Sequence, residues 1–160
     1  MPGMPVWAAQ DGNHGWSAET GPALLAPADG AQGLRLIFIG NGLVEYRDEV
    51  TGWRVYEPML WSPDGKRLAF VGCQDDPCFA TLVTYDLETR LVTQVATRRL
   101  IDSFKWSADS SHIAFVSHMP PCASGEGIPP GKLEVANWDG TSLTTVIDRC
   151  VARTIIGWAP

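Results

Sequence analysis

The sequence predicts an all-β fold built from a repeated unit of four short antiparallel strands. The dipeptide Trp-Ser recurs at residues 16, 61 and 106, so the spacing is 45 residues both times. After each dipeptide come short stretches rich in β-branched and aromatic side chains, separated by turn residues. No segment sustains the apolar period of about 3.6 residues that marks an amphipathic helix. The 16 Gly and 12 Pro among 160 residues agree with many tight turns.

The second unit is the most regular copy. Its first turn is Ser62-Pro-Asp-Gly65, in which Pro fixes φ and Gly accepts a positive φ. Glu88-Thr89 takes the place of a hairpin turn between the last two strands. The expected strands of this unit are about 55–61, 67–72, 80–86 and 91–97.

The third unit repeats this pattern with a different first turn and one insertion. Ala108 and Ser110 replace the Pro and Gly of the first turn, and Asp139-Gly140 is a strong two-residue hairpin signal. The extra residues, Pro120–Gly131, are rich in Pro, Gly and Ser, which is typical of a loop. The expected strands are about 101–106, 112–117, 132–138 and 142–148.

The first unit is degraded and matches the others only in outline. It keeps the apolar stretches Ala23–Ala26, Leu34–Ile39 and Leu43–Tyr46, with the turn Gly40-Asn-Gly42 between the last two. We therefore expect an N-terminal segment, three units and the inner strand of a following unit. Their expected ranges are 1–11, 12–54, 55–100, 101–150 and 151–160.

A four-stranded unit that recurs every 40–45 residues or so is typical of a β-propeller blade. The stretches Trp61–Phe70 and Tyr85–Thr89 resemble the TolB-like repeat, also called the WD40-like or PD40 repeat. Asn137–Thr145 resembles the other common ending of that repeat, the Asp-Gly-Thr variant. The resemblance implies about three four-stranded antiparallel blades of a β-propeller. Because closed propellers have roughly 4–8 blades, we expect an incomplete, open propeller, or a chain that closes by self-association through its open blade faces.

Three interpretations of function follow from the resemblance. The first is a non-enzymatic binding or scaffold module, part of a TolB-like exported protein, which binds a protein or a small ligand through its loops. The second is a fragment of the propeller domain of a prolyl-oligopeptidase-like (S9) peptidase. The third is a degenerate fragment with no function of its own.

Motifs that carry catalysis are missing from the sequence. It contains no Gly-x-Ser-x-Gly elbow, phosphate-binding loop, Rossmann fingerprint or His-Glu-x-x-His motif. We therefore expect no catalytic residues, no cofactor and no enzymatic activity in this chain.

Charge and hydropathy exclude several classes of partner. The net charge is −6 and the 12 Lys and Arg are scattered, so nucleic-acid binding is not expected. No apolar run approaches the roughly 18–20 residues that span a bilayer. The first ten residues lack the basic and apolar regions of a secretory signal. The partner that we expect is a protein, which the sequence does not identify.

The four cysteines fall in loops that we expect at one end of the blades. Cys73 and Cys78 flank a second-to-third-strand loop, Cys122 lies in the equivalent loop of the next unit, and Cys150 lies in that unit's exit connection. These placements favour the disulfides Cys73–Cys78 and Cys122–Cys150 over a metal site that would include His118. Together with the family resemblance, disulfides indicate a periplasmic or extracellular parent protein.

Two sets of repeated residues have both a functional and a structural interpretation. Asp64 and Asp109 occupy equivalent turn positions, where they belong either to a carboxylate site or to the hydrogen bonding of the turn. Tryptophans either stack on a ligand or pack between blades. Because these residues recur with the repeat, we favour the structural interpretation for both. We expect the repeated tryptophans to pack between blades; they are Trp61, Trp106 and Trp158. The repeat places less constraint on Trp7, Trp53 and Trp138, so one of these three can be exposed.

We expect the binding surface at the end of the blades that carries the second-to-third-strand loops and the blade connections. These segments vary between units, whereas the first turns at the opposite end are short and alike. The insertion in the third unit offers Glu126, beside two glycines, and the stiff pair Pro129-Pro130 as a candidate binding loop. A functionless insertion is the competing interpretation.

Overall fold

The structure, a computed structural model, describes residues 23–27, 34–40, 43–74, 77–118, 131–152, 154–155 and 157–158. For residues 23–27, 34–40 and 43–49, and for Glu57, Val151 and Ala152, it describes the backbone alone. Every regular element within these ranges is a β-strand, and no helix there is long and apolar enough to cross a membrane. The all-β class that the sequence predicts is confirmed.

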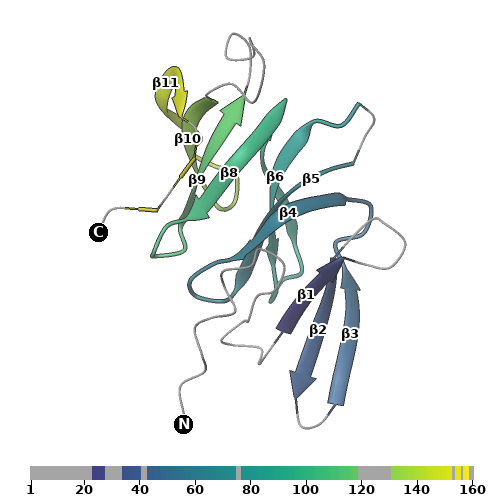
Figure 1. The fold of residues 1–160 in the computed structure, drawn as a ribbon. Coiled ribbons are helices and arrows are strands. Elements are labelled where there is room, and N and C mark those ends of the chain that lie inside the picture. Colours follow the sequence, from purple (N-terminus) through teal and green to yellow (C-terminus); the bar gives the residue numbers. More distant parts are fainter. Residues whose placement is uncertain are drawn as a thin grey trace.

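The strands form three antiparallel sheets, each made of consecutive strands (Figure 1). The first sheet has three described strands, and the second and third have four each. The first sheet contains β1 (Ala23–Pro27), β2 (Leu34–Gly40) and β3 (Leu43–Glu49). The second contains β4 (Arg54–Trp61), β5 (Arg67–Cys73), β6 (Ala80–Asp86) and β7 (Val92–Arg98). The third contains β8 (Leu100–Trp106), β9 (His112–His118), β10 (Gly131–Asn137) and β11 (Thr144–Ala152).

The last hairpin turns are wider than the sequence suggests, and this corrects two expectations. At Asp139-Gly140 the amide of Gly140 donates to the carbonyl of Asn137, whose own amide donates to the carbonyl of Thr141. Ser142 then has a φ of 55°, so the two-residue hairpin is wrong and β11 begins later than expected. At Glu88-Thr89 the amide of Asp86 donates to the carbonyl of Leu91, so this turn also exceeds two residues.

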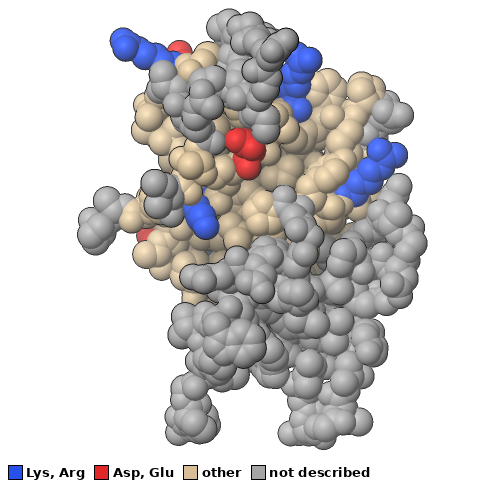
Figure 2. All heavy atoms as spheres, in the orientation of Figure 1, with Lys and Arg blue, Asp and Glu red and all other residues tan. Residues whose placement is uncertain are grey.

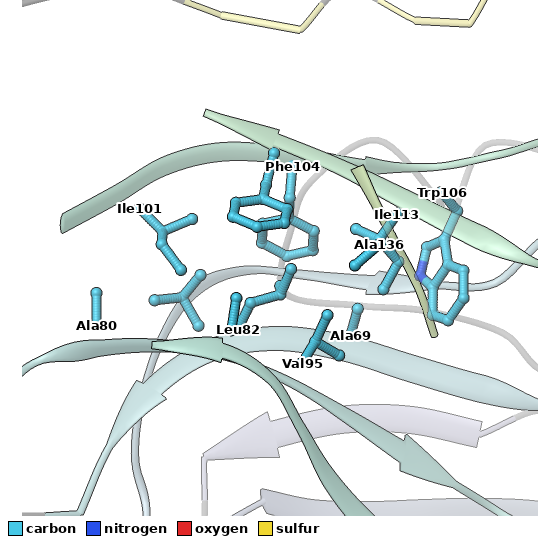
Figure 3. Close-up of a cluster of buried hydrophobic side chains, with 12 residues drawn as sticks. Ala69, Ala80, Leu82, Val95, Ile101, Phe104, Trp106, Ile113 and Ala136 are labelled. Atoms are coloured by element: carbon cyan, nitrogen blue, oxygen red, sulfur yellow. The ribbon is translucent and has the colours of Figure 1, made fainter. Parts of the chain in front are cut away.

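The second and third sheets pack face to face across an apolar core (Figure 3). Alternate residues of each strand point to one face of its sheet, so β6 sends Leu82 and β9 sends Ile113 and Phe115 into the same layer. These three side chains are fully buried, and burial of each stabilises the fold by about 1.5–3 kcal/mol. The complete interblade core is Ala69, Val71, Ala80, Leu82, Val95, Ala96, Ile101, Phe104, Trp106, Ile113, Phe115 and Ala136.

A second apolar cluster covers the opposite face of the second sheet. Trp53, just before β4, packs its ring edge-to-face on Phe70, with centroids 6.3 Å apart and an interplanar angle of 84°. The buried members of the cluster are Val50, Trp53, Met59, Leu68, Phe70, Val83 and Tyr85. Because both faces of the second sheet carry buried clusters, it is a central layer in the described part of the chain.

The indole of Trp106 joins the third sheet to the second, and the indole of Trp158 makes the equivalent hydrogen bond to the third sheet. The Nε1 of Trp106 donates to the carbonyl of Leu60 over 3.0 Å, and the Nε1 of Trp158 donates to the carbonyl of Lys105 over 3.4 Å. Leu60 and Lys105 are equivalent, since each precedes the repeated Trp of its own unit. Residues 154–155 and 157–158 therefore follow the third sheet as the inner strand of the third sheet follows the second, although they form no described strand.

Because neighbouring strands are antiparallel, the sheets have two distinct ends. The turn end carries the β4–β5, β6–β7, β8–β9 and β10–β11 connections. The loop end carries the β5–β6 and β9–β10 connections and the links between sheets. Consecutive four-stranded sheets that pack face to face are blades of a β-propeller, and the described sheets form an open arc that does not close into a ring.

Candidate binding site at the loop end

A disulfide fixes the β5–β6 connection of the second blade. Cys73, the last residue of β5, is bonded to Cys78, with their Cα atoms 5.5 Å apart. The hydroxyl of Tyr56 lies 3.3 Å from Sγ of Cys78 and 3.5 Å from Sγ of Cys73. Disulfide sulfurs carry no proton, so the Tyr56 hydroxyl is the donor. This pair is one of the two disulfides that the sequence favours.

Cys150 is also disulfide-bonded, and Cys122, which the sequence pairs with it, lies outside the described residues. The metal interpretation fails for Cys73, because a sulfur in a disulfide is not a thiolate ligand. His118 is buried, with 2% of its surface exposed, and neither ring nitrogen has a hydrogen-bond partner among the described residues. No cluster of three metal-ligating side chains occurs within these residues.

Beside the disulfide lies a hollow of about 150 Å³, which we call the Trp53 hollow. Trp53 is 4% exposed, whereas the ring of Phe79 is 54% exposed. The hollow faces the side of the second blade opposite the interblade core, since Thr81 shares a face of β6 with Val83 and Tyr85. Its lining residues are Trp53, Gln74, Pro77, Phe79, Thr81, Gln94 and Thr97.

The described lining of the Trp53 hollow is aromatic and polar but uncharged. None of the seven lining residues that the structure describes carries a charge. The hydroxyls of Thr81 and Thr97 share a hydrogen bond of 3.0 Å, and each hydroxyl retains the capacity for a further bond. The amides of Gln74 and Gln94 provide both donors and acceptors. Such a surface suits a neutral ligand that has hydrogen-bonding groups and an apolar face.

A buried ion pair joins the two blades near the loop end. Arg98, at the end of β7, donates from Nε and a terminal nitrogen to the two oxygens of Glu134 on β10, over 2.9 and 2.6 Å. The hydroxyl of Ser117 donates to the same carboxylate. Burial raises the pKa of Glu134, but the bonds from Arg98 and Ser117 outweigh it, so this pKa lies below its ordinary value of 4.5. The pair fixes the second and third blades relative to each other near the loop end.

The repeated aspartates belong to the turns and not to a carboxylate site. The Ser62 hydroxyl donates to Asp64 over 2.6 Å, and the Ser107 hydroxyl donates to Asp109 over the same distance. Hydrogen bonds from Ser107 and Ser111 hold the pKa of Asp109 well below its usual range. Each aspartate also accepts a backbone amide of its own turn. The structural interpretation of the sequence therefore describes these residues.

The departure of the third turn from the repeat has a structural reason. Ser110 stands where the second unit has Gly65, and both residues have positive φ, 61° and 72°. The Ser110 hydroxyl accepts the backbone amide of Asp64 over 3.0 Å. A glycine would adopt this φ more easily, but it would lose the contact between the turns of the two blades.

The tryptophans divide between packing and exposure. Trp106 is buried in the interblade core and Trp61 is half-buried, so Trp61 is less covered than its repeat position suggests. Trp158, which we expected to pack between blades, is exposed, because no described sheet covers its outer side. Trp53 is buried, and Trp138 lies under the guanidinium of Arg67, whose central carbon is 4.0 Å from its ring centroid. Trp7 lies outside the described residues.

The candidate loop of the insertion lies outside the described residues, so Glu126, Pro129 and Pro130 receive no structural account. The sequence identified the Cys73–Cys78 loop as variable but gave no sign that Gln94 and Thr97 of β7 would line a hollow beside it. These residues meet only through the pairing of β6 with β7. In the sequence, Gln94 and Thr97 are recognisable only as polar residues within a predicted strand.

The charged residues of the described chain are dispersed on the face shown in Figure 2. Lys and Arg side chains there lie apart from one another among uncharged residues, and a small acidic group lies between them. This face therefore presents single charges and no continuous basic surface.

Comparison with known proteins identifies the fold. No family model and no curated protein matches the chain. The structure is similar to that of the tricorn protease, with 20% identity over 77% of this chain and 11% of that one, and a TM-score of 0.58. It also matches the β-propeller domain of the Trilobed protease from Pyrococcus furiosus (20% identity, 78% and 36% covered, TM-score 0.48). A further match is TolB from Acinetobacter baumannii (17% identity, 79% and 29% covered, TM-score 0.49).

The order of the strands within the described sheets shows that the chain folds as an arc of β-propeller blades, as its repeat predicts. The chain spans between 11% and 36% of the length of these three proteins. At such identities the likeness concerns the fold, and propeller folds support many unrelated functions.

Proposed function

We propose that this chain is a non-enzymatic binding module, part of an exported TolB-like protein, and that it holds a protein or a small ligand at the loop end of its blades. The observation that supports this most is the Trp53 hollow, an uncharged aromatic and amide-lined site beside a disulfide-fixed loop. Binding sites in scaffolded folds tend to use variable loops on rigid elements, and the loop end has this arrangement.

An exported location agrees with the cysteines. Cys73, Cys78 and Cys150 are all in disulfides, and disulfides persist mainly in the periplasm or outside the cell. If the protein is exported, thiol labelling of the full chain purified from its own compartment should detect no free thiols before reduction and four afterwards. Labelling before reduction would contradict this part of the proposal.

The propeller domain of an S9-type peptidase is the second candidate, favoured by one observation. Two of the matched structures are named as proteases, although their likeness to this chain concerns the fold. In such a protein a separate hydrolase domain would perform the chemistry. The flanking genomic sequence discriminates between the candidates, because a Gly-x-Ser-x-Gly domain in the same reading frame would favour the peptidase.

Selection of peptides from a random display library on the immobilised chain tests the binding proposal. Selected peptides should lose binding to the variant Phe79→Ala, which removes an exposed ring at the loop end. They should keep binding to the matched control Leu91→Ala, which removes an exposed apolar side chain at the turn end. Peptides that depend on Leu91 and ignore Phe79 would contradict the proposal that the loop end is the binding surface.

We expect the isolated chain to show no peptidase, esterase or nucleotidase activity, since the sequence offers no nucleophile with a positioned base. Turnover by the pure chain that a single substitution abolishes would overturn the non-enzymatic assignment.

A further inference from the structure

We infer that the Trp53 hollow binds a neutral sugar ring and that the Cys73–Cys78 disulfide builds this site. The inference rests on the proposed function, because it names the ligand class of the loop end. Four features support it: the volume of the hollow, its aromatic wall, its hydrogen-bonding groups and the absence of charge among its described lining residues.

The volume of the hollow matches one six-membered ring. It measures about 150 Å³, and an apolar cavity of about this size in another protein accommodates a benzene ring. A single water fills about a fifth of that volume, so the hollow is too large for an isolated structural water. It is also too small for a folded peptide segment, although one side chain would fit.

The aromatic wall suits the apolar face of a sugar. The Trp53 ring is held by its edge-to-face contact with Phe70 and is almost fully buried, so it forms a rigid floor. The Phe79 ring is about half exposed at the rim, where burial by a ligand would remove apolar surface from water. Pyranose rings present a face of C–H groups that can pack on such rings.

The polar groups suit hydroxyls that donate and accept at the same time. The Thr81–Thr97 pair and the amides of Gln74 and Gln94 all combine donor and acceptor capacity. A purely apolar side chain of a peptide would leave these groups without partners, which is unfavourable in a desolvated site. A carboxylate or an ammonium group would find no opposite charge among the described lining residues.

The disulfide positions three of the seven lining residues. Gln74 and Pro77 lie inside the loop that Cys73 and Cys78 close, and Phe79 follows it directly. The disulfide restricts the conformations that the β5–β6 connection can adopt, so these side chains are held at the hollow before a ligand binds. Tyr56 supports the bond from the other side through its hydroxyl.

The test uses saturation-transfer NMR on the full chain with the methyl glycosides of glucose, galactose, mannose and N-acetylglucosamine at millimolar concentration. At least one glycoside should receive saturation from the protein, while galacturonate, the charged control, should receive none. Phe79→Ala and Thr97→Val should each raise the Kd about five- to tenfold. The matched controls Leu91→Ala and Thr93→Val, on residues outside the hollow, should leave it within about twofold.

The double variant Cys73→Ala with Cys78→Ala tests the role of the disulfide. It should lose the saturation-transfer signal while its circular dichroism spectrum stays that of the folded chain, because the β5–β6 pairing runs from Arg67–Asp86 to Gly72–Thr81 and does not include the cysteines. An unchanged Kd in this variant would overturn the role of the disulfide.

Two outcomes separate this inference from the proposed function. If no glycoside receives saturation from the folded wild-type chain, the sugar site is refuted, yet peptides that depend on Phe79 would leave the binding module in place. If neither glycosides nor peptides bind at the loop end, both proposals fail.

Discussion

At the scale of single residues, a few side chains connect the two complete blades. Arg98 and Glu134 are separated by 36 positions in the sequence and meet as a bidentate ion pair across the interface. Their side chains are 16% and 6% exposed, so either charge would be poorly solvated without the other. The pair cannot be recognised in the sequence, because neither the arginine nor the glutamate recurs at the equivalent position of another unit.

Removal of the Glu134 charge should destabilise the chain strongly. Glu134→Gln leaves the Arg98 guanidinium without its counter-charge, and we expect a loss of about 3 kcal/mol in the free energy of unfolding. Asp148→Asn is the matched control, since Asp148 pairs with Lys132 but is 78% exposed. This variant should lose less than about 1 kcal/mol in the free energy of unfolding. Urea unfolding of the two variants measures both losses. Equal losses would show that the buried pair contributes no more than a surface pair.

Two glycines with the same backbone conformation allow strain and contact to be separated. Gly140 has a φ of +81° and Gly52 has +83°, so alanine is strained at both. A Cβ at Gly140 would lie 2.9 Å from the carbonyl oxygen of Gln94, whereas nothing lies within 4 Å of one at Gly52. Gly52→Ala should therefore cost about 1 kcal/mol, and Gly140→Ala about 2 kcal/mol or more. Thermal unfolding of the two variants checks the difference, and the reverse order would contradict the close approach of the blades.

At the scale of elements, the repeat is built from the same hydrogen bonds in both complete blades. Ser62 Oγ accepts the amide of Arg67 over 2.9 Å, and Ser107 Oγ accepts the amide of His112 over 2.9 Å. The same hydroxyls donate to Asp64 and Asp109. The Trp-Ser-x-Asp pattern is thus a turn signature, and it positions the first two strands of each blade.

Equivalent turns should respond equally to equivalent substitutions. Ser62→Ala and Ser107→Ala each remove a buried hydroxyl that bonds twice, so each should cost about 1–2 kcal/mol, with a difference below about 0.5 kcal/mol. Thr145→Val, which removes an exposed hydroxyl on β11, should change stability by less than about 0.5 kcal/mol. Chemical unfolding of the three variants measures these changes in the free energy of unfolding. A large effect in one turn alone would show that the repeat is not structurally equivalent.

Much of the fold follows from the sequence, because its information is local. The turn signature and the β-branched stretches predict the strands of the second and third blades within one or two residues, apart from β11. Local sequence does not predict the ends of β11, because they depend on the width of the preceding turn and on the pairing of this strand with Gly131. It does not predict the Trp53 hollow or the Arg98–Glu134 pair either, because each is formed by residues of different strands that come together only when the sheets pack.

At the scale of the whole molecule, several carboxylates are held in the charged form. Burial raises the pKa of Asp64 and Asp86, but hydrogen bonds from Ser62 to Asp64 and from Thr89 to Asp86, together with the charge of Arg67, lower both. Hydrogen bonds from Thr141 lower the pKa of Asp139. The pKa of Glu134 is lowered through Arg98. In the unfolded chain these groups return to ordinary values of 3.8 for Asp and 4.5 for Glu. The unfolded state therefore binds more protons at acidic pH.

Stability should consequently fall in acid. A group with a depressed pKa in the folded state contributes stability above its unfolded pKa and loses it as the pH falls toward the folded value. The urea midpoint should stay nearly constant from pH 7 to about 5 and decline below about 4.5. Glu134→Gln should decline less steeply than wild type, because it lacks one of these groups. A midpoint that rises on acidification would contradict the assignment.

The central claim is that the loop end, and not the turn end, holds the ligand. Amide chemical-shift mapping of the labelled chain tests it most directly, with a glycoside or selected peptide that binds as the probe. The account predicts the largest shifts at Trp53, Gln74, Phe79 and Thr97, and none above background at Gly65, Thr89, Ser110 and Thr141. Largest shifts at the turn residues, with the loop end unchanged, would contradict the account.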